Sequence, residues 1–100
     1  MREHNILHRD MKPGNLLLGH NLEIKVGDFG LAVKLSFVGE RRSSFCGTPC
    51  YMAPEQLESL KGHSYECDVW ALGVIIYYMF TGETPFVQNA QTTKQITKNI

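Results

Sequence analysis

The chain has 100 residues, enough for one small domain at most, and its ten basic and ten acidic residues cancel. This balance gives no electrostatic reason to expect a nucleic acid or an anionic membrane as a partner. The three cysteines, Cys46, Cys50 and Cys67, are an odd number, and the opening MREHN does not resemble a leader peptide. We therefore expect free thiols in a reducing compartment, with no disulfide framework and no zinc set.

A β-hairpin is predicted in the first third of the chain. The apolar segments 15–18 and 22–26 flank a Gly-His-Asn turn, and Ile24 and Val26 alternate with charged residues. This period of two is typical of a half-buried strand, and a turn between two such segments indicates a hairpin. The two glycines of GDFG, at 27–30, end the second strand.

A long polar loop and a short helix are predicted next. Residues 31–48 show no sustained period, and loops of this length are uncommon in compact domains unless they have a function. A short helix is predicted over 53–59, with Pro54 at an early position where its missing N–H costs little.

The apolar run VWALGVIIYYMF, residues 69–80, predicts a buried core helix. As a helix it would be about 18 Å long, too short for the roughly 30 Å core of a bilayer. We expect Asp68 to be its N-cap and Gly82 to end it. A further helix, weakly specified by its pattern, is predicted over 87–100.

Three polar residues cluster around the predicted hairpin. Asp10 and Asn15 flank a tight turn that leads into it, and Asp28 follows its second strand. Because a hairpin returns the chain to its starting point, Asp28 is expected near Asn15. Carboxylate and amide oxygens are the hard ligands that Mg²⁺ prefers, and Mg²⁺ completes its shell with water and phosphate.

The motifs HRDMKPGN, DFG and APE occur in this order, are followed by DVWALG, and resemble the protein kinase family, of Ser/Thr type. The resemblance covers residues 1–100. It implies an α+β fold: part of the large, C-terminal lobe of a kinase, with a catalytic-loop hairpin, an activation segment and a buried helix. The small lobe and the end of the large lobe would be missing from this partial domain.

The resemblance implies ATP and Mg²⁺ as cofactors, a protein as substrate, and a role for each matching residue. Asp10 would orient the substrate hydroxyl, and Lys12 would bind ATP and neutralise charge on the transferred phosphoryl group. Thr48 would contact both of them. Asn15 and Asp28 would hold Mg²⁺ against the phosphates.

Further matching residues would have structural roles. His8 would brace the catalytic turn, Phe29 would pack behind it, and Gly30 would permit a backbone bend. Asp68 would accept backbone hydrogen bonds from the turn at His8. Glu55 of APE normally pairs with a downstream arginine, so here it must be exposed, protonated or satisfied by another group.

Regulation by phosphorylation is also implied, because Arg9 directly precedes Asp10. Ser43 and Ser44 are possible acceptors for an upstream activating kinase, and we favour Ser44. Arg9 and Lys34 would then bind its phosphate.

The segments FVGERRSSFCGTPCYMAPE and KGHSYECDVWALG resemble the polo-like kinases. This implies a cell-cycle role and an intracellular location, in the cytoplasm or nucleus, with the centrosome or spindle as more specific sites. Gly14 and Tyr78 stand where arginine-directed kinases carry glutamate, so no upstream arginine should be preferred. Leu31, after DFG, is typical of kinases that select serine over threonine.

No glycine-rich loop and no VAIK lysine precede His8. We therefore expect the isolated chain to be inactive and marginally stable, as a fragment of a gene or gene model. The alternative function is a non-catalytic kinase remnant that only binds or regulates partners. The remaining polar residues are expected to be ordinary surface groups: His4, His20 and His63, and the solvated pair Arg41 and Arg42.

Overall fold

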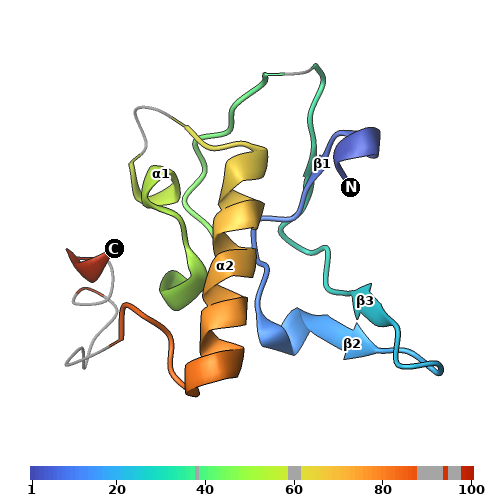
Figure 1. Cartoon of the computed structure of the whole chain (residues 1–100). Coiled ribbons are helices and arrows are strands. Elements are labelled where there is room, and N and C mark those ends of the chain that lie inside the picture. The colour runs from blue at the N-terminus through green and yellow to red at the C-terminus, as the bar shows by residue number, and fades with distance from the viewer. Residues whose placement is uncertain (38, 59–61, 88–93, 95–97) are drawn as a thin grey trace.

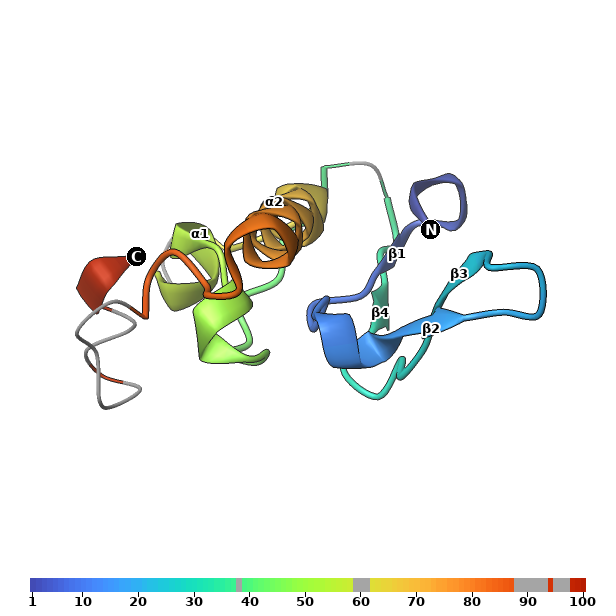
Figure 2. The same ribbon diagram turned by 60° about the horizontal axis from the view of Figure 1, so that its bottom comes forward.

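The computed structural model describes residues 1–37, 39–58, 62–87, 94 and 98–100. The long helix α2 (Tyr65–Thr81) lies in the middle, with the short helix α1 (Pro54–Leu57) on one side and two small sheets on the other (Figure 1). The view in Figure 2 keeps this order, and the molecule is flat, with extents of 42 × 40 × 18 Å. This mixture of helices and antiparallel sheets agrees with the α+β class.

Two antiparallel strand pairs form the sheets. The predicted hairpin is confirmed: β2 (Leu16–Leu18) pairs with β3 (Ile24–Val26). The other pair joins β1 (Ile6–Leu7) to β4 (Val33–Lys34), which lies inside the segment that the sequence predicts as loop. Strands of two residues are too short to show a period, so the loop prediction is wrong at this point.

The alternation in β3 gives a wrong prediction of burial. Ile24 is 69% exposed, although its position in the pattern predicts the covered face of a half-buried strand. The reason is that the hairpin meets the core at its other end, where Leu16 and Val26 pack against the cluster of Met11, Ala71 and Ile75. Three 3₁₀ turns complete the described elements: Arg2–His4, Pro13–Asn15 and Pro49–Tyr51.

Helix α1 spans Pro54–Leu57 and is shorter than the predicted 53–59, since Ala53 is its N-cap and Glu58 its C-cap. Pro54 lies in its first turn, as predicted, because that turn does not need the N–H that proline lacks. The side chain of Gln56 accepts a hydrogen bond from the N–H of Ala53 at 2.9 Å and closes this end of the helix. The last residue of the predicted helix, at 59, lies outside the described residues, as does most of the helix predicted over 87–100.

Helix α2 begins four residues earlier than its apolar run. Ser64 is the N-cap residue, so the prediction of Asp68 as N-cap is wrong, and Asp68 lies within the first turns of the helix. Apolar periodicity cannot mark this start because Tyr65 and Glu66 carry polar groups. The C-terminal end is confirmed: Gly82 takes the left-handed conformation (φ 81°) and donates to the carbonyl of Tyr78 at 2.8 Å.

The core lies on one face of α2. Cys67 packs with Leu7 and Ala53, while Ala71 and Ile75 pack with Met11. The opposite face remains open to solvent and contains large apolar side chains: Val69, Leu72, Ile76 and Phe80. The prediction of a buried helix is therefore correct for one face only. No helix among the described residues is long and apolar enough to cross a membrane.

The two faces of α2 predict different mutational costs. Ile75 is 2% exposed and its neighbour Ile76 is 48% exposed. Ile75→Ala should lower the free energy of unfolding by about 2–4 kcal/mol, because it leaves a cavity. Ile76→Ala is the matched control and should cost less than about 1 kcal/mol. Urea unfolding of the 100-residue chain, followed by fluorescence of the single tryptophan, Trp70, measures both; equal costs would contradict the assignment of faces.

Candidate active site

Three predicted catalytic side chains meet at one point. Thr48 Oγ1 donates to Asp10 Oδ1 at 2.7 Å, and Lys12 Nζ donates to Thr48 Oγ1 at 3.0 Å. Lys12 Nζ also lies 3.4 Å from Asp10 Oδ2. The hydroxyl of Thr48 thus contacts both the carboxylate of Asp10 and the ammonium of Lys12, which lie 38 and 36 residues before it in the chain. It fixes these two charges relative to each other.

Asn15 connects this cluster to the hairpin. It ends the 3₁₀ turn Pro13–Asn15, is 7% exposed, and donates from Nδ2 to the carbonyl of Asp10 at 2.8 Å. Its own carbonyl accepts the N–H of Gly27 at 2.8 Å. Because Asp28 follows Gly27 in the chain, its backbone is held close to the turn Pro13–Asn15. Because Nδ2 is committed to Asp10, the amide oxygen is the ligand atom that Asn15 can offer to a cation.

Asp28 has an unusual backbone. Its φ is 52°, in the left-handed region, and its Oδ1 accepts the N–H of Gly30 at 3.2 Å. A side chain at Gly30 would begin only 3.1 Å from this oxygen. The bend expected at Gly30 thus has its left-handed residue at Asp28, while Gly30 supplies space for the exposed carboxylate.

His8 joins the catalytic turn to the segment after the hairpin. Its side chain is fully buried, its Nδ1 accepts the N–H of Asp10 at 3.2 Å, and its Nε2 lies 2.9 Å from the carbonyl of Gly27. Because Nδ1 accepts, the proton must be on Nε2, where it is donated to Gly27. Phe29 contacts the ring edge-on, with 4.9 Å between centroids.

Asp68, on α2, is hydrogen-bonded to the backbone at His8 and Arg9, the start of the candidate catalytic turn. Its two carboxylate oxygens accept the N–H groups of His8 at 2.8 Å and Arg9 at 2.9 Å. Arg9 has φ 70°, a left-handed conformation that costs a non-glycine residue about 1–2 kcal/mol. Hydrogen bonds to a charged acceptor are worth about 1.5–3 kcal/mol each, enough to offset this cost.

The side chain of Arg9 reaches the segment that carries Ser44. Its Nε donates to the carbonyl of Leu31 at 2.7 Å and its Nη1 to Ser44 Oγ at 3.3 Å. Gly47 has φ 116°, and a Cβ there would lie 2.8 Å from the carbonyl of Arg9, so only glycine fits. Lys34 is exposed on β4, and its backbone carbonyl accepts from Arg42 Nη2 at 3.3 Å.

Two sequence predictions about polar residues are wrong. His63, expected at the surface, is 1% exposed, and Arg42 exchanges two backbone hydrogen bonds with it. Arg41 is not merely solvated, because its guanidinium lies 2.6 Å from a carboxylate oxygen of Glu66. No period or composition signal marks these contacts, since they join segments 21 to 25 residues apart through backbone groups and a single charge pair.

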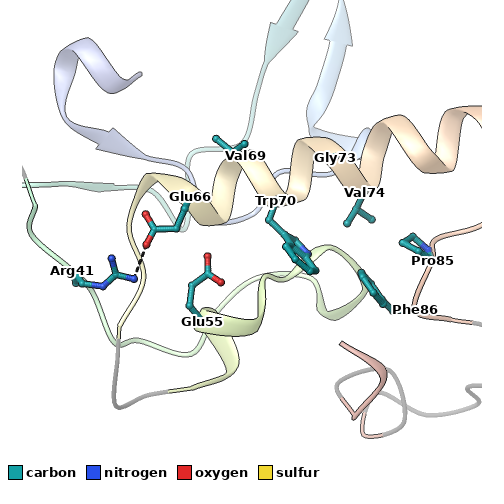
Figure 3. Close-up of a pocket in the computed structure, with 9 residues that line it drawn as sticks. All are labelled: Arg41, Glu55, Glu66, Val69, Trp70, Gly73, Val74, Pro85 and Phe86. Carbon is teal, nitrogen blue, oxygen red and sulfur yellow. Dashed lines mark ion pairs between the residues drawn. The ribbon is translucent and has the colours of Figure 1, made fainter.

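Glu55 lines an apolar groove of about 760 Å³ between α1 and α2. Figure 3 shows its carboxylate turned toward α2, near Trp70 and Glu66, while the ring of Phe86 stacks on that of Trp70 with 5.7 Å between centroids. Glu55 is partly exposed, one of the outcomes that the sequence allows for a carboxylate without its arginine.

Comparison with known proteins agrees with this geometry. The family model described as "Protein kinase domain" matches residues 1–100. The chain belongs to the protein kinase family. This kinase chain is 52% identical over 98 residues to "Probable serine/threonine-protein kinase CCRP1" of Zea mays, which covers 96% of the chain and 16% of the relative.

Polo-like kinases are also among its relatives. The kinase chain is 46% identical over 101 residues to "Serine/threonine-protein kinase PLK1" of Xenopus tropicalis, and 48% identical over 86 residues to "Serine/threonine-protein kinase polo" of Drosophila melanogaster. These matches cover 99% and 86% of the chain, but 17% and 15% of the relatives. The chain thus spans about one sixth of the length of the curated relatives it matches.

The buried His63 predicts acid lability of this kinase chain. Burial, and then the charges of Arg9 and Arg41, lower the pKa of His63, while Asp68 and Glu66 act in the opposite direction. As pH falls below about 6.5, the unfolded chain takes up a proton that the folded chain binds less readily, so stability is lost.

His63→Gln should therefore reduce the fall in melting temperature between about pH 7.5 and about pH 5.5. His20→Gln changes an exposed histidine and should leave the fall unchanged. Thermal unfolding monitored by circular dichroism at the two pH values provides the comparison. The same pH dependence in His63→Gln and wild type would contradict the prediction.

Proposed function

We propose that these residues form the catalytic loop and activation segment of a serine/threonine protein kinase, which transfers the γ-phosphoryl group of ATP to protein hydroxyls. The observation that supports this most directly is the contact among Asp10, Lys12 and Thr48. It places a carboxylate that can receive a hydroxyl proton beside an ammonium that can neutralise phosphoryl oxygens.

The chemistry required of such a site is mainly positioning and charge stabilisation. The transition state of phosphoryl transfer spreads negative charge over the oxygens of the moving group, and fixed cations lower its energy. Lys12 is fixed by Thr48 and Asp10, so it is oriented before a substrate arrives. Asp10 is oriented in turn by Thr48 and Asn15, which leaves its carboxylate facing one direction.

The donor set fits Mg²⁺. Asn15 retains its amide oxygen because the amide nitrogen binds Asp10, and the carboxylate of Asp28 is exposed, one residue after the Gly27 N–H that donates to the backbone carbonyl of Asn15. One amide oxygen and one carboxylate are the kind of sparse, hard ligand set that Mg²⁺ uses together with nucleotide phosphates. Bound there with ATP, Mg²⁺ would neutralise phosphate charge, while Asn15 and Asp28 would hold it.

Regulation through Ser44 belongs to the same proposal. The Ser44 hydroxyl is exposed and already lies within 3.3 Å of Arg9 Nη1, in the segment next to Asp10. A phosphate added by an upstream kinase would replace this hydrogen bond to a neutral hydroxyl by an ion pair with Arg9. Lys34, exposed on β4, would be the second partner of that phosphate.

By its resemblance to the polo-like kinases, the proposal extends to a cell-cycle role and an intracellular location, with the centrosome or spindle as more specific sites. Within this proposal, the substrate is a protein serine in a sequence without a required upstream arginine. Leu31 and Gly14 carry that specificity by resemblance, and a Cβ at Gly14 would meet no atom within 4 Å.

Substitution of the proton acceptor tests the function. In the complete gene product that contains this chain, Asp10→Asn should lower kcat by about 10²–10⁴-fold, because the hydroxyl proton loses its acceptor. Lys25→Met changes a lysine whose side chain is 65% exposed on β3, and should leave kcat unchanged. The measurement is transfer of labelled phosphate from ATP to a serine peptide.

The isolated 100 residues should transfer no phosphate in the same assay, because they contain no glycine-rich loop to cover the nucleotide. A folded, complete gene product with no transfer would replace the proposal by the non-catalytic alternative.

Peptide selection tests the specificity. A peptide array phosphorylated by the complete gene product should show serine above threonine and no enrichment of upstream arginine. Gly14→Glu should then raise kcat/KM for an arginine-containing peptide up to about fivefold, the value of one exposed ion pair. The same peptide with leucine in place of arginine is the control. Strong arginine selection by the wild type would contradict the prediction.

A further inference from the structure

The activation segment is fastened to the first turn of α2 by Arg41. Its Nη2 lies 2.6 Å from Glu66 Oε1 and donates to the carbonyl of Gly62 at 2.9 Å. Figure 3 shows the guanidinium and the Glu66 carboxylate turned toward each other, with the ion pair drawn between them. Gly62 and Glu66 lie 21 and 25 residues further along the chain than Arg41.

The backbone next to Arg41 makes a second attachment to the same place. The N–H of Arg42 donates to the carbonyl of His63 at 2.8 Å, and the N–H of His63 donates back to Arg42 at 2.7 Å. Gly62 has φ 65°, and a Cβ there would lie 3.0 Å from the carbonyl of Arg42. Glycine thus permits the close approach of the two segments. His63, which pairs with Arg42 there, is buried.

A third attachment lies a few residues downstream. Gly47 packs against the carbonyl of Arg9, and Thr48 binds Asp10 and Lys12. Residues 43–45 lie between the Arg42–His63 bridge and Gly47 and are exposed, and Ser44 is among them. The segment 43–46 is therefore a short arch that is fixed at both ends and presents Ser44 to solvent.

We propose that Arg41 and Glu66 are positioning residues, which together with the Gly62 carbonyl and the Arg42–His63 bridge form a clasp that holds the upstream end of the Ser44 arch on α2. Its effect on catalysis rests on the function proposed above, whereas the clasp itself is a property of the fold. Arg41 forms its ion pair with Glu66, so the clasp does not require phosphorylation of Ser44. The arginine that contacts Ser44 is Arg9.

The electrostatics of Glu66 agree with this role. Burial alone would raise the pKa of Glu66, but its hydrogen bond to its own backbone and the Arg41 guanidinium outweigh burial and lower that pKa. Glu66 is therefore charged at neutral pH. Both side chains remain partly exposed, so the ion pair alone is modest, and the clasp gains its strength by acting together with the backbone bridge.

Amide hydrogen exchange of the 100-residue chain tests the clasp without any requirement for activity. Arg41→Glu should speed exchange at the amides of Arg42 and His63 about fivefold, relative to the amide of Gly27 in the hairpin. The double variant Arg41→Glu/Glu66→Arg should restore slow exchange. The single variant Arg41→Lys, which keeps the charge, should exchange at a rate between those of the wild type and Arg41→Glu. Lys25→Glu, which breaks an exposed ion pair with Glu23, is the matched control and should change neither amide. Unchanged exchange in Arg41→Glu, or no rescue by the double variant, would overturn the clasp.

Kinetics of the complete gene product test the positioning role. Arg41→Glu should raise KM for a serine peptide about fivefold and leave kcat within about twofold, because the Thr48 contacts still hold Asp10 and Lys12. The charge-reversed double variant should recover KM. Unchanged KM alongside faster exchange would overturn the positioning role. Absence of phosphate transfer in the wild type would reject the proposed function, and the exchange result would still decide the clasp.

Discussion

The carboxylate of Asp68 is the contact on which the site depends. It accepts two consecutive backbone amides, of His8 and Arg9, across 60 residues of sequence. The carboxylate lies on α2, the longest described helix, so it ties the turn at His8 and Arg9 to the helix that carries much of the core. Asp10 and the β2–β3 hairpin follow this turn in the chain, so the attachment to Asp68 helps to fix their position.

The attachment also explains how unfavourable backbone conformations persist. Arg9 and Asp28 both have positive φ values, of 70° and 52°, at the two points where the site changes direction. Such conformations are stable only when the surroundings determine them. At Arg9 the determinant is Asp68, and beside Asp28 it is the pair of hydrogen bonds that Gly27 makes with Asn15 and His8. Local strain at the site is thus offset by contacts from distant segments.

The sequence predicts the features whose signals are local. The β2–β3 hairpin, the place of Pro54 in the first turn of α1 and the end of α2 at Gly82 each have a residue type that specifies them, and each is confirmed. Features that arise from pairing between distant segments have no such signal. The strands β1 and β4, the bridge at His63 and the contact of Arg41 with Glu66 belong to this class. The N-cap error at Asp68 shows the same limit, because its partners, His8 and Arg9, lie far away in sequence and only the family resemblance implies them.

The site depends on the buried face of α2 and not on its open face. The buried face, with Cys67, Ala71 and Ile75, meets the catalytic segment and α1, whereas the open face carries Phe80 at 87% exposure. An apolar helix that is covered on one side contributes only part of the burial energy that its sequence could supply. The hydrogen bonds of the catalytic turn do not involve that open face. The geometry of the site is therefore specified by contacts on the buried side of α2, whether or not its open face is covered.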